Sequence, residues 1–428
     1  MLGSLLDVCK LITLGLVVNP IAGMGGRVGL KGTDGVAQEA LKRGAKPVSP
    51  ERTKDFLNAL KRNFQDSLSF PQIITCAGMM GQEETDISDI KPSQILQIPP
   101  VDASAIEGSL NPQVPQHLLE TEARHTKMAV KEFIAREVDL IVFVGGDGTA
   151  RDVLDVLNEY KRGGMTKAPR AKPSITNDDA DLLPPVLGVP SGVKMYSAVF
   201  ALNPADAAEI VSLFSEGKAE VDELEVLDID EDAFRNDRLS MHLYGYMKCL
   251  YVPSRSQASK EISPDLSDEK ENQEAIARTI IEIMEPDAVY LLGPGTTMKS
   301  LADLLKVKKT LLGVDVYCKG KILVADASEE TILRELKQHG GGKNAWIVVS
   351  PIGRQGMIFG RGNQQISSKV IKAIGKDHIM VLATRAKIQD LDGGALKVDT
   401  GDKDVDNMLR GYSKVLTDYR EWRMLQVR

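Results

Sequence analysis

The sequence predicts an α/β protein of two domains. The first is expected to hold an open parallel sheet with helices, and the second a mixed α/β domain with some antiparallel strands. Short apolar runs alternate with segments of helical periodicity over most of the chain, which is typical of sheets covered by helices. Several of the apolar runs end in glycine-rich turns that open a helix. The chain has 428 residues, and a single core rarely grows beyond roughly 250–300 residues.

Apolar runs bounded by glycine, proline and polar residues indicate the elements of the first half. Strands are expected at residues 11–18, 70–78, 138–144 and 185–190. Helices are expected at residues 35–43, 49–63, 122–136, 151–161 and 205–216. Two polar stretches rich in proline or glycine, residues 86–116 and 161–181, are expected to be a long loop and an insertion.

The pattern changes after Val221, where two antiparallel strands are expected at residues 225–230 and 239–252. A charged connection follows at residues 254–273. Later strands are expected at residues 289–292, 311–316, 322–325, 346–349 and 378–383. Helices are expected after residue 297, at 329–338 and 367–374, and as a terminal helix at 404–426. We place the domain boundary near residues 215–222, which divides the chain into 1–218 and 219–428.

Composition and charge exclude several classes of function. The net charge of −7 argues against a nucleic-acid-binding protein, which is normally basic. The four cysteines are far apart in the sequence and form no C-x-x-C pair, so neither a zinc site nor a disulfide framework is supported, and a reducing, cytoplasmic setting is the simple interpretation. No signal peptide or membrane-spanning segment is expected from the apolar pattern. A P-loop and a complete G-x-G-x-x-G fingerprint are both missing from the sequence.

The most informative motif follows the apolar run at residues 138–144. It consists of Gly145, Gly146, Asp147, Gly148 and Thr149. Glycines let a backbone approach phosphates closely, and the following helix directs its N–H groups and dipole at an anion. Asp147 could accept a proton from an attacking hydroxyl or hold hydrated Mg²⁺. The alternative is a tight strand–helix turn with an aspartate cap. Asp152 could also hold Mg²⁺, although a favourable carboxylate in the first helical turn is the preferred interpretation.

Glycine-rich loops recur at other expected strand ends. Asn19 ends the first strand and is followed by Gly23 and Gly25, so backbone amides there could cover a phosphate, or the segment is a flexible loop. Ser191 and Gly192 form a turn, and Lys194 beyond it either neutralises phosphates or extends from a helix start into solvent.

The expected second domain repeats this pattern. Gly293, Gly295, Thr296 and Thr297 open a helix, as an anion site or as an ordinary cap. Asp315, at a strand end, could bind a ribose hydroxyl or form a turn. A later loop offers hydrogen-bond donors suited to a nucleotide, or only surface polar groups. Its residues are Gly360, Arg361, Asn363 and Gln364.

These motifs together resemble the ATP–NAD kinase superfamily, which also includes diacylglycerol and sphingosine kinases and, more remotely, phosphofructokinases. The resemblance begins with Asn-Pro-x-x-Gly at residues 19–23 and Gly-Gly-Asp-Gly-Thr at 145–149. Four further segments resemble the archaeal and bacterial ATP–NAD kinase-like branch that includes the acetoin-catabolism protein X. They are residues 187–195, 293–297, 312–315 and 359–367.

The resemblance implies transfer of the γ-phosphoryl group of ATP, or of phosphate from polyphosphate, to the 2′-hydroxyl of NAD, giving NADP. Asp147 would contact or deprotonate that hydroxyl, while the neighbouring glycines and Thr149 would line the phosphate site. Mg²⁺ would accompany the phosphates, and enzymes of this kind are usually homo-oligomers.

One departure leaves the acceptor open. The Asn-Glu pair that binds the nicotinamide-side ribose in well-studied NAD kinases is replaced here by residues 190–194, Pro-Ser-Gly-Val-Lys. The acceptor could therefore be another small hydroxyl metabolite, or the protein could be a nucleotide-binding regulator without turnover. A lipid acceptor is less expected because no amphipathic membrane-docking segment is apparent.

Overall fold

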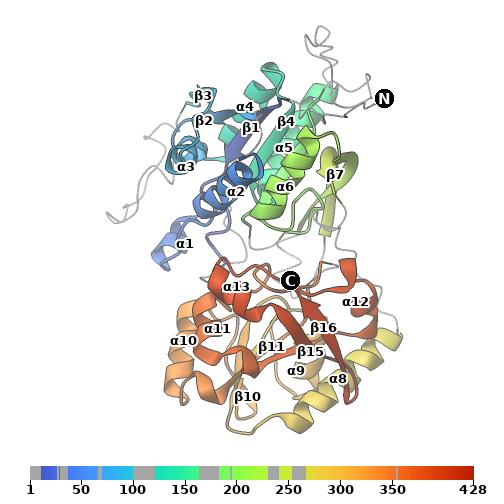
Figure 1. Ribbon diagram of the computed structural model, residues 1–428. Helices are drawn as coiled ribbons and strands as arrows, with labels where there is room; N and C mark the ends of the chain where they lie inside the picture. The colour runs from blue at the N-terminus through green and yellow to red at the C-terminus, as the bar shows by residue number, and fades with distance from the viewer. Residues whose placement is uncertain are drawn as a thin grey trace.

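The computed structural model describes residues 11–26, 28, 37–65, 70–99, 121–162, 183–192, 195–229, 241–252, 267–352 and 355–428. They form two units, each a seven-stranded sheet covered by helices (Figure 1). The predicted two-domain α/β architecture is therefore confirmed. Within the described part of the chain, no helix is both long enough and apolar enough to span a membrane.

The first sheet has the strand order β3-β2-β1-β4-β5-β7-β6. All neighbouring strands pair in parallel except β6 and β7, which are antiparallel. The strand bounds are β1 Thr13–Val18, β2 Gln72–Cys76, β3 Gln94–Leu96, β4 Leu140–Gly145, β5 Val186–Pro190, β6 Glu220–Ile229 and β7 Met241–Tyr251. The central strands β4 and β5 are buried throughout, as their continuous apolar sequences require.

Helices cover both faces of this sheet (Figure 1). α2 and α6 pack their apolar side chains against one face, and α4 and α5 pack theirs against the other. The helix bounds are α1 Ala37–Lys42, α2 Ser49–Asn63, α3 Gln82–Ile87, α4 Ala123–Ala135, α5 Asp147–Arg162 and α6 Pro204–Ser215, with a 3₁₀ turn η1 at Gly78–Met80. The helices that connect the strands from β1 to β5 therefore return the chain to the end of the sheet where the next parallel strand begins.

The second sheet has the order β10-β9-β8-β11-β13-β15-β16. Four neighbouring strands, β8, β11, β13 and β15, pair in parallel. The outer strands β9, β10 and β16 each pair with a neighbour in antiparallel fashion. The bounds are β8 Val289–Leu292, β9 Asp315–Cys318, β10 Lys321–Val324, β11 Ala345–Val349, β13 Ile379–Leu382, β15 Gly411–Asp418 and β16 Glu421–Val427. A two-stranded sheet joins β12 Met357–Phe359 to β14 Lys397–Val398.

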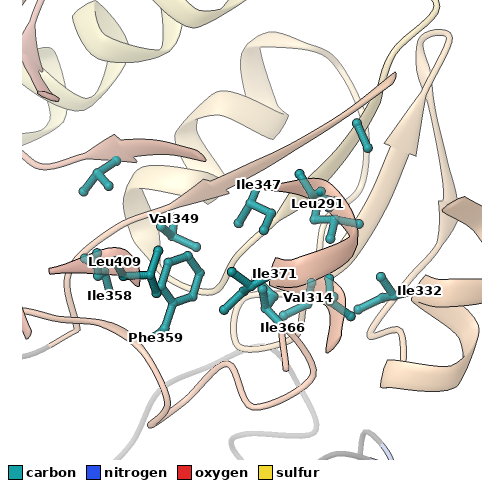
Figure 2. Close-up of a cluster of buried hydrophobic side chains, with 14 of the residues drawn as sticks. Leu291, Val314, Ile332, Ile347, Val349, Ile358, Phe359, Ile366, Ile371 and Leu409 are labelled. Carbon is teal, nitrogen blue, oxygen red and sulfur yellow. The ribbon is translucent and has the colours of Figure 1, made fainter. Parts of the chain in front are cut away.

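The helices of the second unit also lie on both faces of its sheet. α8 and α9 share one core, while α10, α11 and α13 share the other. Figure 2 shows part of the core beneath α10, α11 and α13, where Leu291 and Ile347 from the sheet lie near Ile371 of α11. The helix bounds are α8 Ser267–Ile283, α9 Thr296–Leu304, α10 Glu329–Gln338, α11 Ser368–Ile374, α12 Arg385–Gln389 and α13 Lys403–Leu409, with 3₁₀ turns η4 Gly342–Asn344, η5 Lys376–His378 and η6 Asp392–Gly394.

The expected terminal helix at 404–426 is wrong. α13 ends at Leu409, and the chain then forms the hairpin β15–β16, which turns at Tyr419 and Arg420. Arg410 leaves the helical conformation with a ψ of 158°, and Gly411 follows with a φ of +114°, so the helix ends before the strand starts at Gly411. The hairpin buries Val415 and Leu416 at the end of the sheet, and this gain outweighs the helical periodicity of the segment.

Three further expectations need correction. The connection expected at 254–273 includes the start of α8, and the strand expected at 311–316 lies at Asp315–Cys318. The loop expected at 86–116 contains the end of α3 and the strand β3. The insertion expected at 161–181 falls outside the described residues beyond Arg162.

The two strands expected beyond the domain boundary are antiparallel, as predicted, but they extend the first sheet. β7 pairs with β5 through Val186 and Cys249, and β6 forms the outer strand. Val221 of β6 and Val252, just after β7, pack against the core beneath α2 and α6. The division into 1–218 and 219–428 therefore cuts this sheet, and we propose a boundary after Tyr251.

Candidate active site

Asp147 is the first residue of α5, directly beyond the carboxyl end of β4. Its side chain is buried, and only 5% of the residue is exposed. Oδ2 accepts a hydrogen bond from the backbone N–H of Tyr196 at 2.6 Å, and Oδ1 accepts one from Ser197 at 3.1 Å. Amide donors and the positive end of a helix both stabilise a carboxylate in its charged form.

The loop that supplies these amides is held by β6. Ser197 Oγ donates to the carbonyl oxygen of Leu227 at 2.9 Å and accepts from the Leu227 N–H at 3.0 Å. The N–H of Ala198 donates to the carbonyl oxygen of Glu225 at 3.1 Å. Burial, followed by the charge of Asp147, raises the pKa of the Tyr196 hydroxyl. The Asp147 carboxylate is therefore fixed by a backbone clamp that depends on β6.

Two glycines let the turns after β4 and β5 touch. A Cβ atom on Gly146 would lie 3.2 Å from the Cα of Gly192, and one on Gly192 would lie 2.9 Å from the Cα of Gly146. The backbone N–H of Ser191 donates to the carbonyl oxygen of Gly145 at 2.9 Å. The turns after β4 and β5 are therefore in direct contact beside Asp147.

Asn19 and Thr149, both predicted to contact phosphate, contact each other. Asn19 Nδ2 donates to Thr149 Oγ1 at 3.0 Å, and the Asn19 N–H donates to the carbonyl oxygen of Val144 at 3.0 Å. Thr149 is only 3% exposed. These two side chains join the end of β1 to the first turn of α5, next to Gly145 and Gly148.

Gly23 brings the loop after β1 against the turn after β5. Its φ is +79°, and a Cβ atom there would lie 1.8 Å from the carbonyl oxygen of Ser191. Ser49, the first residue of α2, strengthens the junction: its Oγ lies 2.9 Å from Ser191 Oγ and 3.1 Å from the carbonyl oxygen of Ala22. Sequence reasoning did not single out Ser49, although a serine before a proline is a common helix start.

The remaining residues predicted near Asp147 are placed as follows. Gly25 is buried in the loop after β1, whereas Lys194 lies outside the described residues. Asp152 faces α4, where its Oδ1 lies 3.7 Å from Lys127 Nζ. In the described part of the chain, no group of three or more His, Cys, Asp or Glu side chains could hold a metal ion. This geometry fits the preferred interpretation of Asp152 as a helix carboxylate.

The loop after β8 forms a similar turn at the second sheet. The N–H of Gly293 donates to the carbonyl oxygen of Val348 at 2.9 Å, and that of Gly295 donates to Leu311 at 2.8 Å. α9 then begins at Thr296, which is exposed, and continues with Thr297, which is buried. The four residues predicted here, from Gly293 to Thr297, therefore lie together at the carboxyl end of β8.

Asp315 lies beside this turn but is fully buried. Its carboxylate accepts hydrogen bonds from the N–H and Oγ1 of Thr310 and from the N–H of Asp326, each at 2.7 Å. Lys309 Nζ lies 3.9 Å from the same carboxylate. Asp315 thus has the geometry of a loop anchor, and its contact with a ribose stays a prediction.

The loop at residues 360–363 uses its donors inside the protein. Asn363 is fully buried; its Oδ1 accepts from the Gly360 N–H at 3.1 Å, and its Nδ2 donates to the carbonyl oxygen of Ile358 at 2.8 Å. Arg361 donates to the carbonyl oxygens of Ala201, at 2.6 Å, and Leu202. Burial lowers the pKa of Arg361 to about 10. Arg361 therefore ties the second domain to the first.

Two more contacts join the domains beside this loop. Gln364 Nε2 donates to the carbonyl oxygen of Gly192 at 3.4 Å. Arg52 of α2 binds both oxygens of Asp399 through Nη1, at 2.7 and 2.9 Å, and both side chains are largely buried. The turn next to Asp147 is therefore in direct contact with the second domain.

Comparison with known proteins agrees with this arrangement. Residues 14–162 match the ATP-NAD kinase N-terminal domain, and residues 285–427 match the ATP-NAD kinase C-terminal domain. The chain belongs to the ATP-NAD kinase family. It is thus a member of a family of phosphotransferases with an alcohol acceptor.

No curated protein matches the chain. One similar solved structure, from Bacillus anthracis strain Sterne, is provisionally described as a diacylglycerol kinase. It shares 15% identity over 52% of this chain, with a TM-score of 0.22. The match spans 44% of that protein, less than half of its length.

Proposed function

We propose that this protein transfers the γ-phosphoryl group of ATP to the 2′-hydroxyl of the adenosine ribose of NAD, giving NADP. The observation that carries the proposal is the Asp147 carboxylate, held by two backbone amides at the N-terminus of α5. Membership in the ATP-NAD kinase family, through both of its domains, supports the donor and the acceptor.

Phosphoryl transfer requires positioning and charge neutralisation more than covalent chemistry. In the proposed reaction Asp147 orients the attacking hydroxyl and accepts its proton. Gly145, Gly146 and Gly148 let the backbone approach the phosphates, and the N-terminus of α5 faces their negative charge. Ser191, Gly192 and Gly23 hold these groups in place through the contacts described above.

A Mg²⁺ ion in the proposed reaction arrives with the nucleotide. Mg²⁺ commonly keeps several waters and is held largely by substrate phosphates, so the proposal needs no carboxylate ligand besides Asp147, which it uses as the base. When bound, the ion would neutralise charge on the phosphates. Removal of divalent cations with a chelator is expected to abolish phosphoryl transfer, and added Mg²⁺ is expected to restore it.

We also propose that the protein is a cytoplasmic homo-oligomer that acts on small molecules, not on nucleic acids or membranes. The net charge of −7 supports the exclusion of nucleic acids. The buried free thiols of Cys76, Cys249 and Cys318 agree with a reducing compartment.

The test is incubation of the purified full chain with ATP, Mg²⁺ and NAD, with NADP detected by an NADP-specific dehydrogenase. We expect NADP to accumulate with ATP and to be lost when ATP is omitted. Inorganic polyphosphate in place of ATP tests the second donor. If no NADP forms above background with either donor, the NAD assignment is contradicted.

A second candidate acceptor is another small hydroxyl metabolite. It is favoured by residues 190–194, which stand where related kinases have the Asn-Glu pair for the second ribose. A screen of hydroxyl compounds with labelled ATP distinguishes this candidate from NAD. ATP binding without phosphoryl transfer to any acceptor would instead identify a nucleotide-binding regulator.

A further inference from the structure

An arginine of the second domain contacts the segment that orients Asp147. We call residues 195–202 the clamp segment, because its amides at residues 196 and 197 hold the Asp147 carboxylate. Arg361 lies between β12 and α11, and its Nη2 donates to the carbonyl oxygens of Ala201, at 2.6 Å, and Leu202. One end of the clamp segment therefore holds Asp147, and the other end is held by Arg361.

Within the first domain, the clamp segment is fixed along its first part and its middle. The first part contacts β6 through the hydrogen bonds described above. In the middle, the Gly188 N–H of β5 donates to the carbonyl oxygen of Val199, and the Ala201 N–H donates to that of Gly188, both at 2.9 Å. At the end of the segment, the guanidinium of Arg361 donates to the last two carbonyl oxygens. This end is therefore anchored from the second domain.

The loop that carries the guanidinium is itself fixed within the second domain. Nη1 of Arg361 lies 3.4 Å from Oε1 of Gln355, and the two residues are 6% and 2% exposed. Asn363 braces the loop through the two hydrogen bonds described above. Gly360 has a φ of +113°, and a Cβ atom there would lie 2.3 Å from the carbonyl oxygen of Asp399. Arg361 is therefore presented to the first domain by a buried and closely packed loop.

The charge of Arg361 strengthens its hold on the clamp segment. Burial lowers the pKa of Arg361 to about 10, and the carboxylates of Asp399 and Asp147 are among the charges that oppose this shift. The guanidinium therefore stays charged at neutral pH, and hydrogen bonds from a charged donor are stronger than neutral ones. Ala201 and Leu202 are 0% and 3% exposed, so loss of this donor would leave their carbonyl oxygens unsatisfied in a buried place.

The connection between the domains gives this contact its importance. The chain passes from the first sheet to the second once, between Tyr251 of β7 and Ser267 of α8. The arrangement of two domains joined in this way depends on the contacts between them. Of the three contacts described above, those of Arg52 and Gln364 involve α2 and the turn after β5. The contact of Arg361 is the one made to the clamp segment.

We propose that Arg361 is a positioning residue for phosphoryl transfer, because its hold on the clamp segment keeps the Tyr196 and Ser197 amides aligned on Asp147. The inference rests on the function proposed above, in which Asp147 orients the attacking hydroxyl. It adds that this carboxylate is correctly oriented when the second domain is docked against the first. A misplacement of about 1 Å at a reacting group can cost roughly 10²-fold in rate, so a distant anchor can control turnover.

The first test is hydrogen exchange of the purified full chain without substrates, followed by mass spectrometry of peptides from the clamp segment. We expect Arg361→Met to speed exchange there by roughly tenfold or more, with peptides from β8 and β11 unchanged. Arg52→Met is the matched control, since it removes the buried ion pair with Asp399 but no contact to the clamp segment. It should change exchange in that segment much less.

Three results of this experiment would overturn the proposal. The first is exchange in the clamp segment of Arg361→Met equal to that of the unmodified protein. The second is equal acceleration in Arg52→Met, since docking in general would then hold the segment. The third is acceleration throughout the chain, which would indicate a loss of stability only. Each result counts whether or not the protein phosphorylates NAD.

The second test separates positioning from substrate binding. In Arg361→Met, kcat should fall by roughly 10- to 100-fold while the KM for ATP changes little, because Arg361 contacts backbone carbonyls. Arg361→Lys keeps a charged donor and should recover part of kcat and of the exchange protection, which also covers the case in which Arg361→Met does not fold. A raised KM with kcat unchanged would contradict the positioning role. Absence of transfer by the unmodified protein would contradict the proposed function, while hydrogen exchange would still decide whether Arg361 holds the clamp segment.

Discussion

The carboxyl ends of the two sheets share one local design but carry opposite charges. In the first domain, the turn after β4 opens α5 with Asp147, whose carboxylate accepts two backbone amides. In the second domain, the turn after β8 opens α9 beside Lys387, whose ammonium contacts two hydroxyls. A helix N-terminus favours an anion in both places. The first domain builds that anion into the chain at the helix start, whereas in the second domain the charge at the turn is a lysine that faces the Glu269 carboxylate.

The two turns also differ in how closely they are packed. Gly23 and Gly146 lie against the backbone of the turn after β5, so a side chain at either position would meet Ser191 or Gly192. Gly295 instead borders open space. In both domains a charged side chain lies at a strand–glycine–helix turn. The residues packed around each turn differ, and so does the sign of the charge, which is negative at Asp147 and positive at Lys387.

The largest expected effect comes from Asp147→Asn. The amide keeps the shape of the side chain but removes its charge and its capacity as a base, so kcat should fall by about 10²–10⁴. The amide nitrogen would also face a backbone N–H, which should destabilise the fold by about 1–3 kcal/mol. The measurements are the rate of NADP formation at saturating substrates and the free energy of unfolding in urea. A kcat for Asp147→Asn equal to that of the unmodified protein would remove the distinction between the two turns and the proposed role of Asp147.

A smaller effect is expected from Gly23→Ala, with Gly44→Ala as its matched control. The two glycines have φ values of +79° and +81°, so an alanine costs about 1–2 kcal/mol of backbone strain at each. At Gly44 the added Cβ meets nothing within 4 Å, whereas at Gly23 it lies 1.8 Å from the Ser191 carbonyl oxygen. Gly23→Ala should therefore destabilise the protein by about 1–3 kcal/mol more than Gly44→Ala. Equal free energies of unfolding would show that the junction is loose.

The smallest effect concerns the ion pair that joins the domains. Arg52 and Asp399 are 14% and 13% exposed, so their double-mutant cycle with alanine should give a coupling of about 0.5–3 kcal/mol. Lys131 and Glu159, an exposed pair between α4 and α5, provide the control cycle and should couple much less. A coupling for Arg52 and Asp399 no larger than the control would mean that the pair does not hold the domains together.

The sequence predicted the location of the first turn because buried parallel strands leave a clear signal. β4 and β5 are continuous apolar runs that stop at glycine or proline, so Gly145–Thr149 and Ser191-Gly192 could be assigned to strand ends. Asn19 could be assigned for the same reason at the end of β1. The carboxyl ends of parallel strands meet at one edge, which brings these segments together.

The contacts made by polar side chains were harder to predict. Arg361 and Asn363 read as exposed donors, but the folded chain buries them against carbonyl oxygens that lie elsewhere in the sequence. Lys387 lies 90 positions from Thr297, on a five-residue helix with no motif of its own. The sequence of the hairpin β15–β16 predicts a helix because its many exposed residues obscure the alternation of a strand.

The support of the Asp147 clamp by β6 has a consequence for attempts to recombine this chain with its relatives. A fragment that stops at residue 218 contains the whole Gly145–Thr149 motif, yet it lacks Leu227, whose backbone holds Ser197. It would also leave β5 without its partner β7, and an unpaired strand edge promotes aggregation. A crossover that preserves the active loop therefore has to retain residues through Tyr251, so that the motif and its distant support are inherited together.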